Sequence, residues 1–324
     1  LNRQVLEEML EQVQKPARYL GGEMNTQVKP FDSAEVRFAF CFPDTYEVAM
    51  SHLGMKILYA LINAQSWALC ERVCMPWVDM KALMEEKQVP LFSLESRTPI
   101  SEFDVVGFTL QYEMSYSNVL AMMKLGNIPL RTAERGEDDP IVCVGGPCAF
   151  NPEPLADFID AVMIGDGEEQ MLEFITVVRE WKQSGKPRNE CLKALAKLDG
   201  VYVPSFYDVT YHEDGTIASF TPNCPDAPAK VRKAIVKDMD TAFYPTEIPV
   251  PYTEIVHDRI MLEIMRGCTR GCRFCEAGML YRPVRERSLE RLMGLAKKLE
   301  KSTGYEEISL SSLSSGDYSC LPEL

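Results

Sequence analysis

Short apolar runs alternate with stretches of helical spacing between residues 34 and 185. The runs predict strands, and the stretches between them predict helices. The predicted strands cover residues 36–42, 73–75, 104–110, 141–144 and 161–164, and the predicted helices cover 53–61, 79–87, 118–125 and 169–181. Strands that are apolar along most of their length are typical of a parallel sheet with helices on both faces. The pattern therefore predicts an α/β fold with a Rossmann-like, doubly wound parallel sheet over residues 34–185.

The pattern changes on either side of this sheet. Residues 1–33 open with a helical pattern and then a turn, so we expect an N-terminal arm. Residues 186–255 are polar and rich in proline, which predicts a small β-rich linker. Within it, we expect residues 201–203 and 206–211 to pair with 217–220 as a β-hairpin.

Residues 256–324 show the order strand, loop, helix and strand. The strands are predicted at 260–265 and 308–310, with a helix at 288–301 between them. This order predicts the start of a (β/α) barrel. A complete barrel takes roughly 200 residues or more, which is far longer than this range. We therefore expect the sequence to be an N-terminal fragment of a longer protein, inactive by itself.

Charge and hydropathy exclude some classes of binding partner. The net charge of −14 argues against a protein that coats nucleic acid or an anionic membrane non-specifically. The longest apolar runs are shorter than a membrane span, and the N-terminus lacks the apolar core of a signal peptide. We therefore expect a cytoplasmic protein without a membrane partner. RNA, a protein and a small molecule all remain open as substrates.

Ten of the 11 cysteines fall into two groups. Cys268, Cys272 and Cys275 are clustered in the spacing Cys-x3-Cys-x2-Cys. Cys70 and Cys74 repeat the Cys-x3-Cys spacing, but in a strand-like run without glycine, so we predict no metal site there. Most of the scattered cysteines are predicted to be buried free thiols, because cysteine packs as a small hydrophobe. The seven in question are Cys41, Cys70, Cys74, Cys143, Cys148, Cys191 and Cys224.

The clustered cysteines lie on a predicted loop that follows the strand 260–265. Gly267 and Gly271 allow the chain to bend, and charged residues separate the cysteines. Thiolate ligands select zinc or iron–sulfur clusters, and structural zinc usually takes four ligands. Three cysteines therefore favour an iron–sulfur cluster, with zinc and a chance group of thiols as the alternatives. In a 4Fe–4S cluster the fourth iron would lack a protein ligand and could bind a small molecule.

The spacing Cys-x3-Cys-x-aromatic-Cys, with Phe274 before the last cysteine, resembles the signature of the radical S-adenosylmethionine (SAM) enzymes. This resemblance implies a 4Fe–4S cluster that binds SAM and, reduced by an external donor such as flavodoxin or ferredoxin, cleaves it to a 5′-deoxyadenosyl radical. It also implies that Phe274 lies near the adenine. Ser315, Gly316 and Asp317, at the end of the next strand, would meet the methionine amino group, although the family's frequent Gly-Gly-Glu is absent there.

The upstream sheet resembles the cobalamin-binding domain that precedes the radical barrel in one large subclass. Ligands of such sheets lie beyond the carboxyl ends of the strands, so Thr109, Gly145 and Gly146 are candidate contacts of the cobalamin nucleotide tail. Several runs also resemble an uncharacterised group of cobalamin-binding radical SAM proteins. These runs are Lys15-Pro16-Ala17-Arg18-Tyr19, Phe42-Pro43-Asp44-Thr45-Tyr46-Glu47, Ser51-His52-Leu53-Gly54, Asn151-Pro152-Glu153-Pro154 and Gly165-Asp166-Gly167-Glu168.

His52 departs from the pattern of histidines that ligate cobalt. Cobalamin domains of that kind carry Asp-x-His-x-x-Gly after the first strand, whereas here Asp44 precedes His52 by eight residues and Gly54 follows it by two. We therefore expect His52 to cap or pack at a helix start, with a contact to the corrin ring as the alternative.

Together these features predict a radical SAM enzyme that uses cobalamin, with methyl transfer as the simplest reaction. One alternative is a tRNA methylthiotransferase, which would need a second cluster on three cysteines at strand ends of the first domain. Cys41 and Cys148 are loosely placed for this, but no cysteine follows Thr109 at the end of the third strand. A second alternative is a non-catalytic sensor of redox state or cobalamin.

Overall fold

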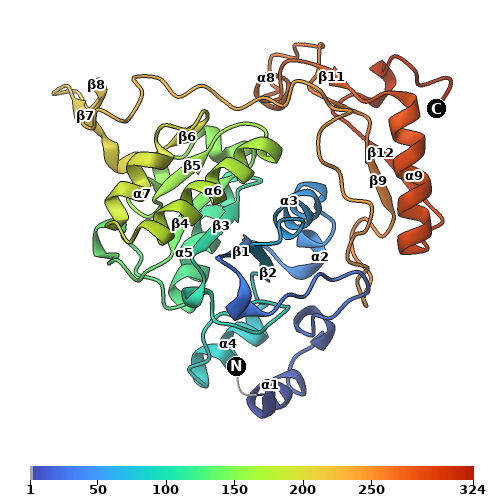
Figure 1. Ribbon diagram of the computed structural model, residues 1–324, viewed down its shortest axis with the longest axis horizontal. Helices are drawn as coiled ribbons and strands as arrows, with labels where there is room; N and C mark the ends of the chain where they lie inside the picture. Colours follow the sequence, from blue (N-terminus) through green and yellow to red (C-terminus); the bar gives the residue numbers. More distant parts are fainter. Residues whose placement is uncertain (1–2) are drawn as a thin grey trace.

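The computed structural model describes residues 3–324, and its largest feature is a six-stranded sheet (Figure 1). The strand order is β2-β1-β3-β4-β5-β6, in which the first five strands are parallel and β6 is antiparallel to β5. The strands are β1 (Val36–Phe42), β2 (Ala68–Cys74), β3 (Val105–Thr109), β4 (Ile141–Gly145), β5 (Ala161–Met163) and β6 (Val201–Tyr202). Five parallel strands are thus confirmed, although β2 begins five residues before the predicted strand 73–75.

The chain adds strands on one side of β1 and then on the other, and this change of side defines a doubly wound sheet. The chain runs from β1 outward to β2, then crosses back to β3 and continues to β5. In sheets of this kind the carboxyl ends of β1 and β3 flank a crevice where ligands bind. The helices that connect or follow the strands are α2 (Tyr46–Ala49), α3 (Leu53–Asn63), α4 (Val78–Glu86), α5 (Tyr116–Leu125), α6 (Gly167–Ser184) and α7 (Arg188–Leu195).

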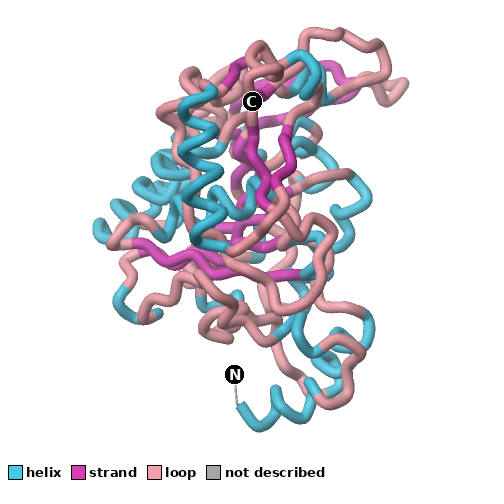
Figure 2. The backbone as a smooth tube through the Cα atoms, turned by 90° about the vertical axis from the view of Figure 1, so that its right-hand side faces the viewer, coloured by secondary structure: helices cyan, strands magenta, loops and turns pink. Residues whose placement is uncertain are grey.

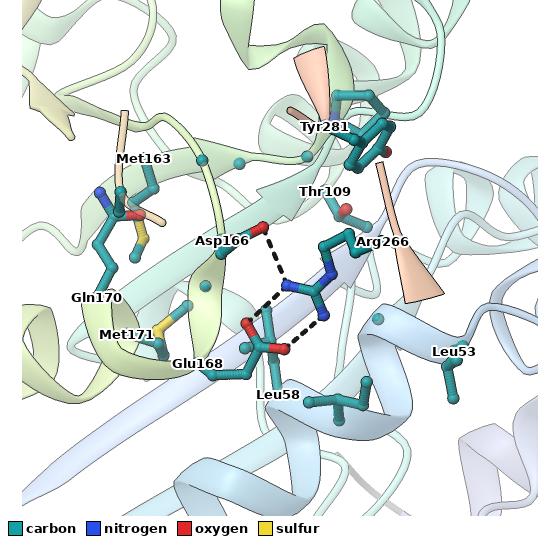
Figure 3. A pocket seen from close by; sticks show the side chains of 18 of the residues that line it. Leu53, Leu58, Thr109, Met163, Asp166, Glu168, Gln170, Met171, Arg266 and Tyr281 are labelled. Carbon is teal, nitrogen blue, oxygen red and sulfur yellow. Dashed lines mark hydrogen bonds and ion pairs between the residues drawn. The ribbon is translucent and has the colours of Figure 1, made fainter. Parts of the chain in front are cut away.

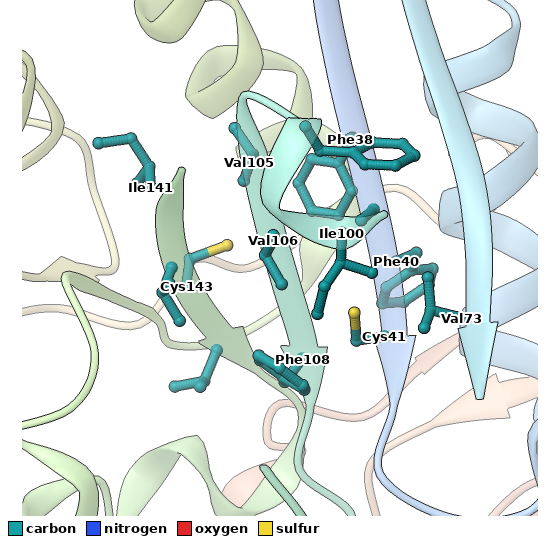
Figure 4. Packing of buried hydrophobic residues seen from close by; sticks show 14 of the residues in the cluster. Phe38, Phe40, Cys41, Val73, Ile100, Val105, Val106, Phe108, Ile141 and Cys143 are labelled. Carbon is teal, nitrogen blue, oxygen red and sulfur yellow. The ribbon is translucent and has the colours of Figure 1, made fainter. Parts of the chain in front are cut away.

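The core of the sheet is tightly packed around its central strands (Figure 4). Every residue of β3 is buried, as expected for a central strand covered on both faces. Gly107 in β3 makes room for the ring of Phe38 from β1, because a Cβ at position 107 would lie 2.4 Å from Cζ of that ring. The apolar residues of adjacent strands therefore fix the register of the sheet.

The C-terminal part forms a second, smaller layer. Its strands β9 (Ile260–Glu263) and β12 (Ile308–Ser311) pair in parallel, and α9 (Leu289–Thr303) packs on them. Helix α9 begins as predicted, with the Ser288 hydroxyl accepting a hydrogen bond from the Arg291 amide at 3.2 Å. Ile57 of α3 belongs to the core of this layer, so the two layers share an apolar contact.

The remaining elements connect and flank these layers. The hairpin of β7 and β8 projects from the body, and α1 lies at the opposite end of the molecule from the C-terminal segment (Figures 1 and 2). No helix among residues 3–324 is long and apolar enough to cross a membrane. The elements are α1 (Arg3–Leu10), β7 (Tyr207–Tyr211), β8 (Ile217–Pro222), β10 (Met265–Arg266), α8 (Ala277–Leu280) and β11 (Arg285–Glu286).

Some sequence predictions need correction. Residues 201–203 were predicted to join the hairpin, but Val201 and Tyr202 instead pair with Met163 and Val162 of β5. This pairing extends the apolar sheet, whereas the hairpin of β7 and β8 is largely exposed. Helix α7 was not predicted, because only two apolar residues of this short polar segment, Cys191 and Leu195, are buried.

Candidate functional site

A cavity of about 390 Å³ lies where the strand ends of the sheet face the C-terminal layer (Figure 3). One wall comes from the sheet, including Thr109 at the end of β3 and Gly145 at the end of β4. The opposite wall comes from the segment that follows β9, including Arg266 and Gly267. The cavity is therefore built jointly by the two parts of the chain.

The four residues predicted as cobalamin contacts, His52, Thr109, Gly145 and Gly146, all line this cavity. Gly146 has a φ of 95°, and a Cβ there would lie 2.7 Å from the carbonyl oxygen of Leu110. Only glycine allows the loop after β4 to approach the end of β3 this closely. The strand ends thus converge as the sequence predicts, although their part in ligand binding stays a prediction.

His52 caps helix α3, as expected. Its Nδ1 accepts a hydrogen bond from the Met55 amide at 3.1 Å, and its ring lies 5.4 Å from that of Phe42. Burial lowers the pKa of His52 to about 4, although a hydrogen bond with Gln111 acts in the opposite direction. The imidazole is therefore neutral at pH 7, with one ring nitrogen committed to the helix cap.

Gln170 was missed by sequence reasoning and also lines the cavity. Its side chain is 2% exposed, and Nε2 donates to the Asp199 carbonyl at 2.9 Å. Its Oε1 is buried without a hydrogen-bond donor, an arrangement that costs about 1–3 kcal/mol. A ligand that donates an N–H would satisfy this oxygen. No feature of the sequence distinguishes Gln170 from other polar residues of a helix.

The predicted cysteine loop leaves and re-enters the C-terminal layer through a narrow neck. Its two sides are β10 and β11, which pair Met265 with Glu286 and Arg266 with Arg285. Gly267 closes the neck with a φ of 91°, and a Cβ there would lie 2.8 Å from the carbonyl oxygens of Tyr281 and Pro283. The cysteines therefore lie on a loop whose ends are held together.

The structure brings the three cysteines to this one loop. Cys268 and Cys275 are partly buried and Cys272 is exposed. The amide of Arg270 donates to Sγ of Cys268 at 3.5 Å, and Gly271 bends the chain with a φ of 62°. Across residues 3–324, no three histidine, cysteine or acidic side chains are arranged as a metal site. The thiols thus share a loop without converging on one point.

This loop still suits an iron–sulfur cluster by the chemistry of its donors. Three thiols on a glycine-bent segment match the ligands that such clusters require, and hydrogen bonds to sulfur are one means by which proteins tune them. The hydrogen bond from the Arg270 amide to Sγ of Cys268 is of this type. Ligation by Cys268, Cys272 and Cys275 remains a prediction.

The residues predicted to contact SAM are divided between two environments. Ser315, Gly316 and Asp317 follow β12 and lie beside the cysteine loop, because Arg270 Nε donates to Asp317 Oδ2 at 2.7 Å. That hydrogen bond, together with one from Ser314, lowers the pKa of Asp317. Phe274, in contrast, is 92% exposed and does not line the cavity.

A cluster of ion pairs joins the neck of the loop to the sheet (Figure 3). The guanidinium of Arg266 contacts Asp166 at 2.9 Å, Glu168 at 2.7 Å and Glu263 at 2.9 Å. Burial opposes its charge, but Glu263 and Glu168 raise the pKa of Arg266 above its ordinary value. The run Gly165-Asp166-Gly167-Glu168 was singled out from the sequence, but its contact with Arg266 was not predicted.

Comparison with known proteins finds a family match within the chain. Residues 54–204 match the family model described as radical SAM proteins, N-terminal. Over these residues the chain is similar to the radical SAM proteins. It is also 30% identical over 239 residues to an uncharacterized protein, MJ0966, of Methanocaldococcus jannaschii. That match covers 73% of this chain and 44% of the relative.

A solved structure of a radical SAM enzyme shares the fold. The cobalamin-bound methyltransferase TsrM of Kitasatospora setae, which also holds a 4Fe–4S cluster, is 12% identical with a TM-score of 0.51. The match covers 86% of this chain and 48% of TsrM. The cobalamin-dependent enzyme OxsB is 14% identical with a TM-score of 0.48, over 86% of this chain and 34% of OxsB. The chain thus spans less than half the length of each of these relatives.

Proposed function

We propose that the protein is a cobalamin-dependent radical SAM enzyme that transfers a methyl group. The observation that carries this proposal is the shared cavity. Gly267, next to the first cysteine, lines the same space as Thr109 and Gly145 at the strand ends. A cluster on the loop and a cofactor on the sheet would therefore face each other across one cavity.

The cysteine loop would hold the cluster through Cys268, Cys272 and Cys275. When bound and reduced, a 4Fe–4S cluster would supply the electron for the reductive cleavage of SAM. The chain's own part is to hold the loop at the cavity by its closed neck. The ion pair between Arg270 and Asp317 holds the segment that follows β12 against the same loop. Ser315 and Gly316 would there approach the amino group of SAM.

The sheet would hold cobalamin at its strand ends. Cobalamin supplies a methyl donor in this chemistry, and its rim carries amides that can donate hydrogen bonds. The unpaired Oε1 of Gln170 is suited to one such amide, and Gly145 and Gly146 allow close approach of the nucleotide tail. His52 is engaged as a helix cap, so we place it in the cavity wall rather than on cobalt.

We also propose an external one-electron donor of the flavodoxin or ferredoxin type. The open substrate classes are RNA, a protein or a small molecule. The net charge of −14 weighs against binding of bulk nucleic acid.

The test uses the full-length protein, reconstituted without oxygen. Iron and cobalt are quantified, and 5′-deoxyadenosine and methylated products are measured by mass spectrometry with methyl-labelled SAM. We expect about four irons and about one cobalt per chain, with both products formed. About eight irons without cobalt would instead support a methylthiotransferase. Both cofactors without SAM cleavage would support a sensor and contradict the proposed enzyme.

A further inference from the structure

The carboxylate of Asp166 contacts both sides of the neck of the cysteine loop. Asp166 follows β5 and lies at the start of α6. Its Oδ1 contacts Arg266 Nη1 at 2.9 Å, and its Oδ2 accepts a hydrogen bond from Arg285 Nη1. Arg266 and Arg285 are paired with each other across β10 and β11. One side chain of the sheet therefore binds both strands from which the loop emerges.

Asp166 is itself held rigidly by the linker. Its amide donates to the carbonyl of Ala234 at 2.9 Å, and its Oδ2 also accepts from the Val236 amide at 2.9 Å. The preceding Gly165 has a φ of 116°, and a Cβ there would lie 2.2 Å from the Ala234 carbonyl oxygen. The linker therefore passes too close to the strand end for any other residue. This fixes the carboxylate relative to the cavity.

The exit side of the loop is tied to the same linker. Lys233 Nζ donates to the carbonyl of Leu280 at 2.8 Å, at the end of α8, and also to that of Arg282. Lys233 is directly followed by Ala234, which pairs with the end of β5. The neck is thus held by Lys233 from the linker and by Asp166 and Glu168 from the start of α6. Of these three residues, Asp166 is the one that contacts both Arg266 and Arg285.

We propose that Asp166 is a positioning residue that fixes the cysteine loop relative to the strand-end cavity. It touches none of the proposed cofactor ligands and acts through Arg266 and Arg285. The inference rests on the proposed function, because the position of the loop matters only if the loop and the strand ends each hold a cofactor. Removing the charge of Asp166 should leave the thiols able to bind iron but should free the neck to move.

Asp160 provides a matched control in the same sheet. Its Oδ2 is 2.9 Å from Arg135 Nη1 and 2.8 Å from Arg188 Nη2, and it accepts from the Val142 amide at 2.7 Å. Asp160 therefore binds two arginines and one amide, as Asp166 does. None of these three partners, however, belongs to the cysteine loop or its neck. The two aspartates separate a general loss of buried ion pairs from a specific loss of loop position.

The experiment compares Asp166→Asn and Asp160→Asn in the full-length, reconstituted protein. Hydrogen exchange is followed over residues 267–285, and iron content, thermal midpoint and SAM cleavage with dithionite as reductant are measured. We expect both variants to melt earlier and to keep wild-type iron. Only Asp166→Asn should exchange faster across 267–285 and lower kcat for SAM cleavage about 10- to 100-fold, with KM for SAM little changed.

Two further outcomes keep the inference separate from the proposed function. Equal exchange and equal cleavage in both variants, with an active wild type, would overturn the role of Asp166 alone. A wild type that neither binds iron nor cleaves SAM would overturn the proposed function, and the inference would fall with it. If Asp166→Asn does not fold, Arg285→Lys serves instead. It keeps the charge at the neck and should give a smaller change in the same direction.

Discussion

The chain contains the spacing Cys-x3-Cys twice, once on a strand of the sheet and once on a loop. Cys70 and Cys74 lie on β2 within the sheet, whereas Cys268 and Cys272 lie on the loop beyond β10. Cys70 is fully buried and Cys272 is exposed. The same spacing therefore occurs once as part of a core and once as part of a candidate metal site.

Backbone conformation explains the difference. A strand rises about 3.3 Å per residue, so four residues along β2 separate the two α-carbons by about 13 Å. No single metal or small cluster could be bound by both thiols there. At the second pair, Gly267 and Gly271 have left-handed φ values that turn the chain. The capacity of two cysteines to share a ligand thus depends on the backbone between them more than on their spacing.

The largest expected difference between the two pairs is in iron content. In the full-length, reconstituted protein, Cys272→Ala should reduce iron from about four per chain to near zero, because a cluster with only two remaining thiolates is poorly held. Cys74→Ala should keep the wild-type iron. Iron is measured by a colorimetric assay together with absorbance near 400 nm. Equal loss of iron in both variants would show that the first pair also takes part in cluster binding.

Thiol reactivity should separate the pairs next. In the apoprotein at pH 8, we expect iodoacetamide to label Cys272 about 100-fold faster than Cys70, since Cys70 must wait for an opening that costs about 3 kcal/mol. Burial also raises the pKa of Cys70, and the thiolate is the reactive form. Peptide mass spectrometry over time gives both rates from one sample, and 6 M guanidinium chloride should make the two rates similar. Comparable rates in the folded protein would mean that β2 opens readily.

The sequence predicted those parts of the molecule that depend on local pattern. The strand at 36–42 and the start of α9 at Ser288 match the structure because an apolar run and a capping hydroxyl are local features. The contact of Asp166 with Arg266 could not be predicted in the same way. These residues are 100 positions apart, and only the folded chain brings them together. The cavity could not be predicted from the sequence for the same reason, since its two walls come from distant segments.

Stability should depend more strongly on the first pair than on the second. Cys70→Ser places a hydroxyl in the core without an evident partner, and we expect the free energy of unfolding to fall by about 1–3 kcal/mol. Cys268→Ser changes a partly buried loop residue, and in the apoprotein it should alter stability by less than about 0.5 kcal/mol. Urea unfolding followed by circular dichroism measures both. A larger effect at Cys268 would indicate that the loop is structured by its thiols even without a cluster.

The smallest expected difference is in the alkaline range. Burial raises the pKa of Cys74 to about 12, although the nearby Arg72 acts in the opposite direction. Because the folded state holds this proton more tightly than the unfolded state, the contribution of Cys74 to stability is complete below pH 9 and is lost as the pH rises towards 12. Between pH 8 and about pH 9.7, Cys74→Ala should therefore lose about 1 kcal/mol less stability than the wild type. Cys272→Ala, in which Cys74 is intact, should follow the wild type, and a flat difference between Cys74→Ala and the wild type over this range would contradict a buried, protonated Cys74.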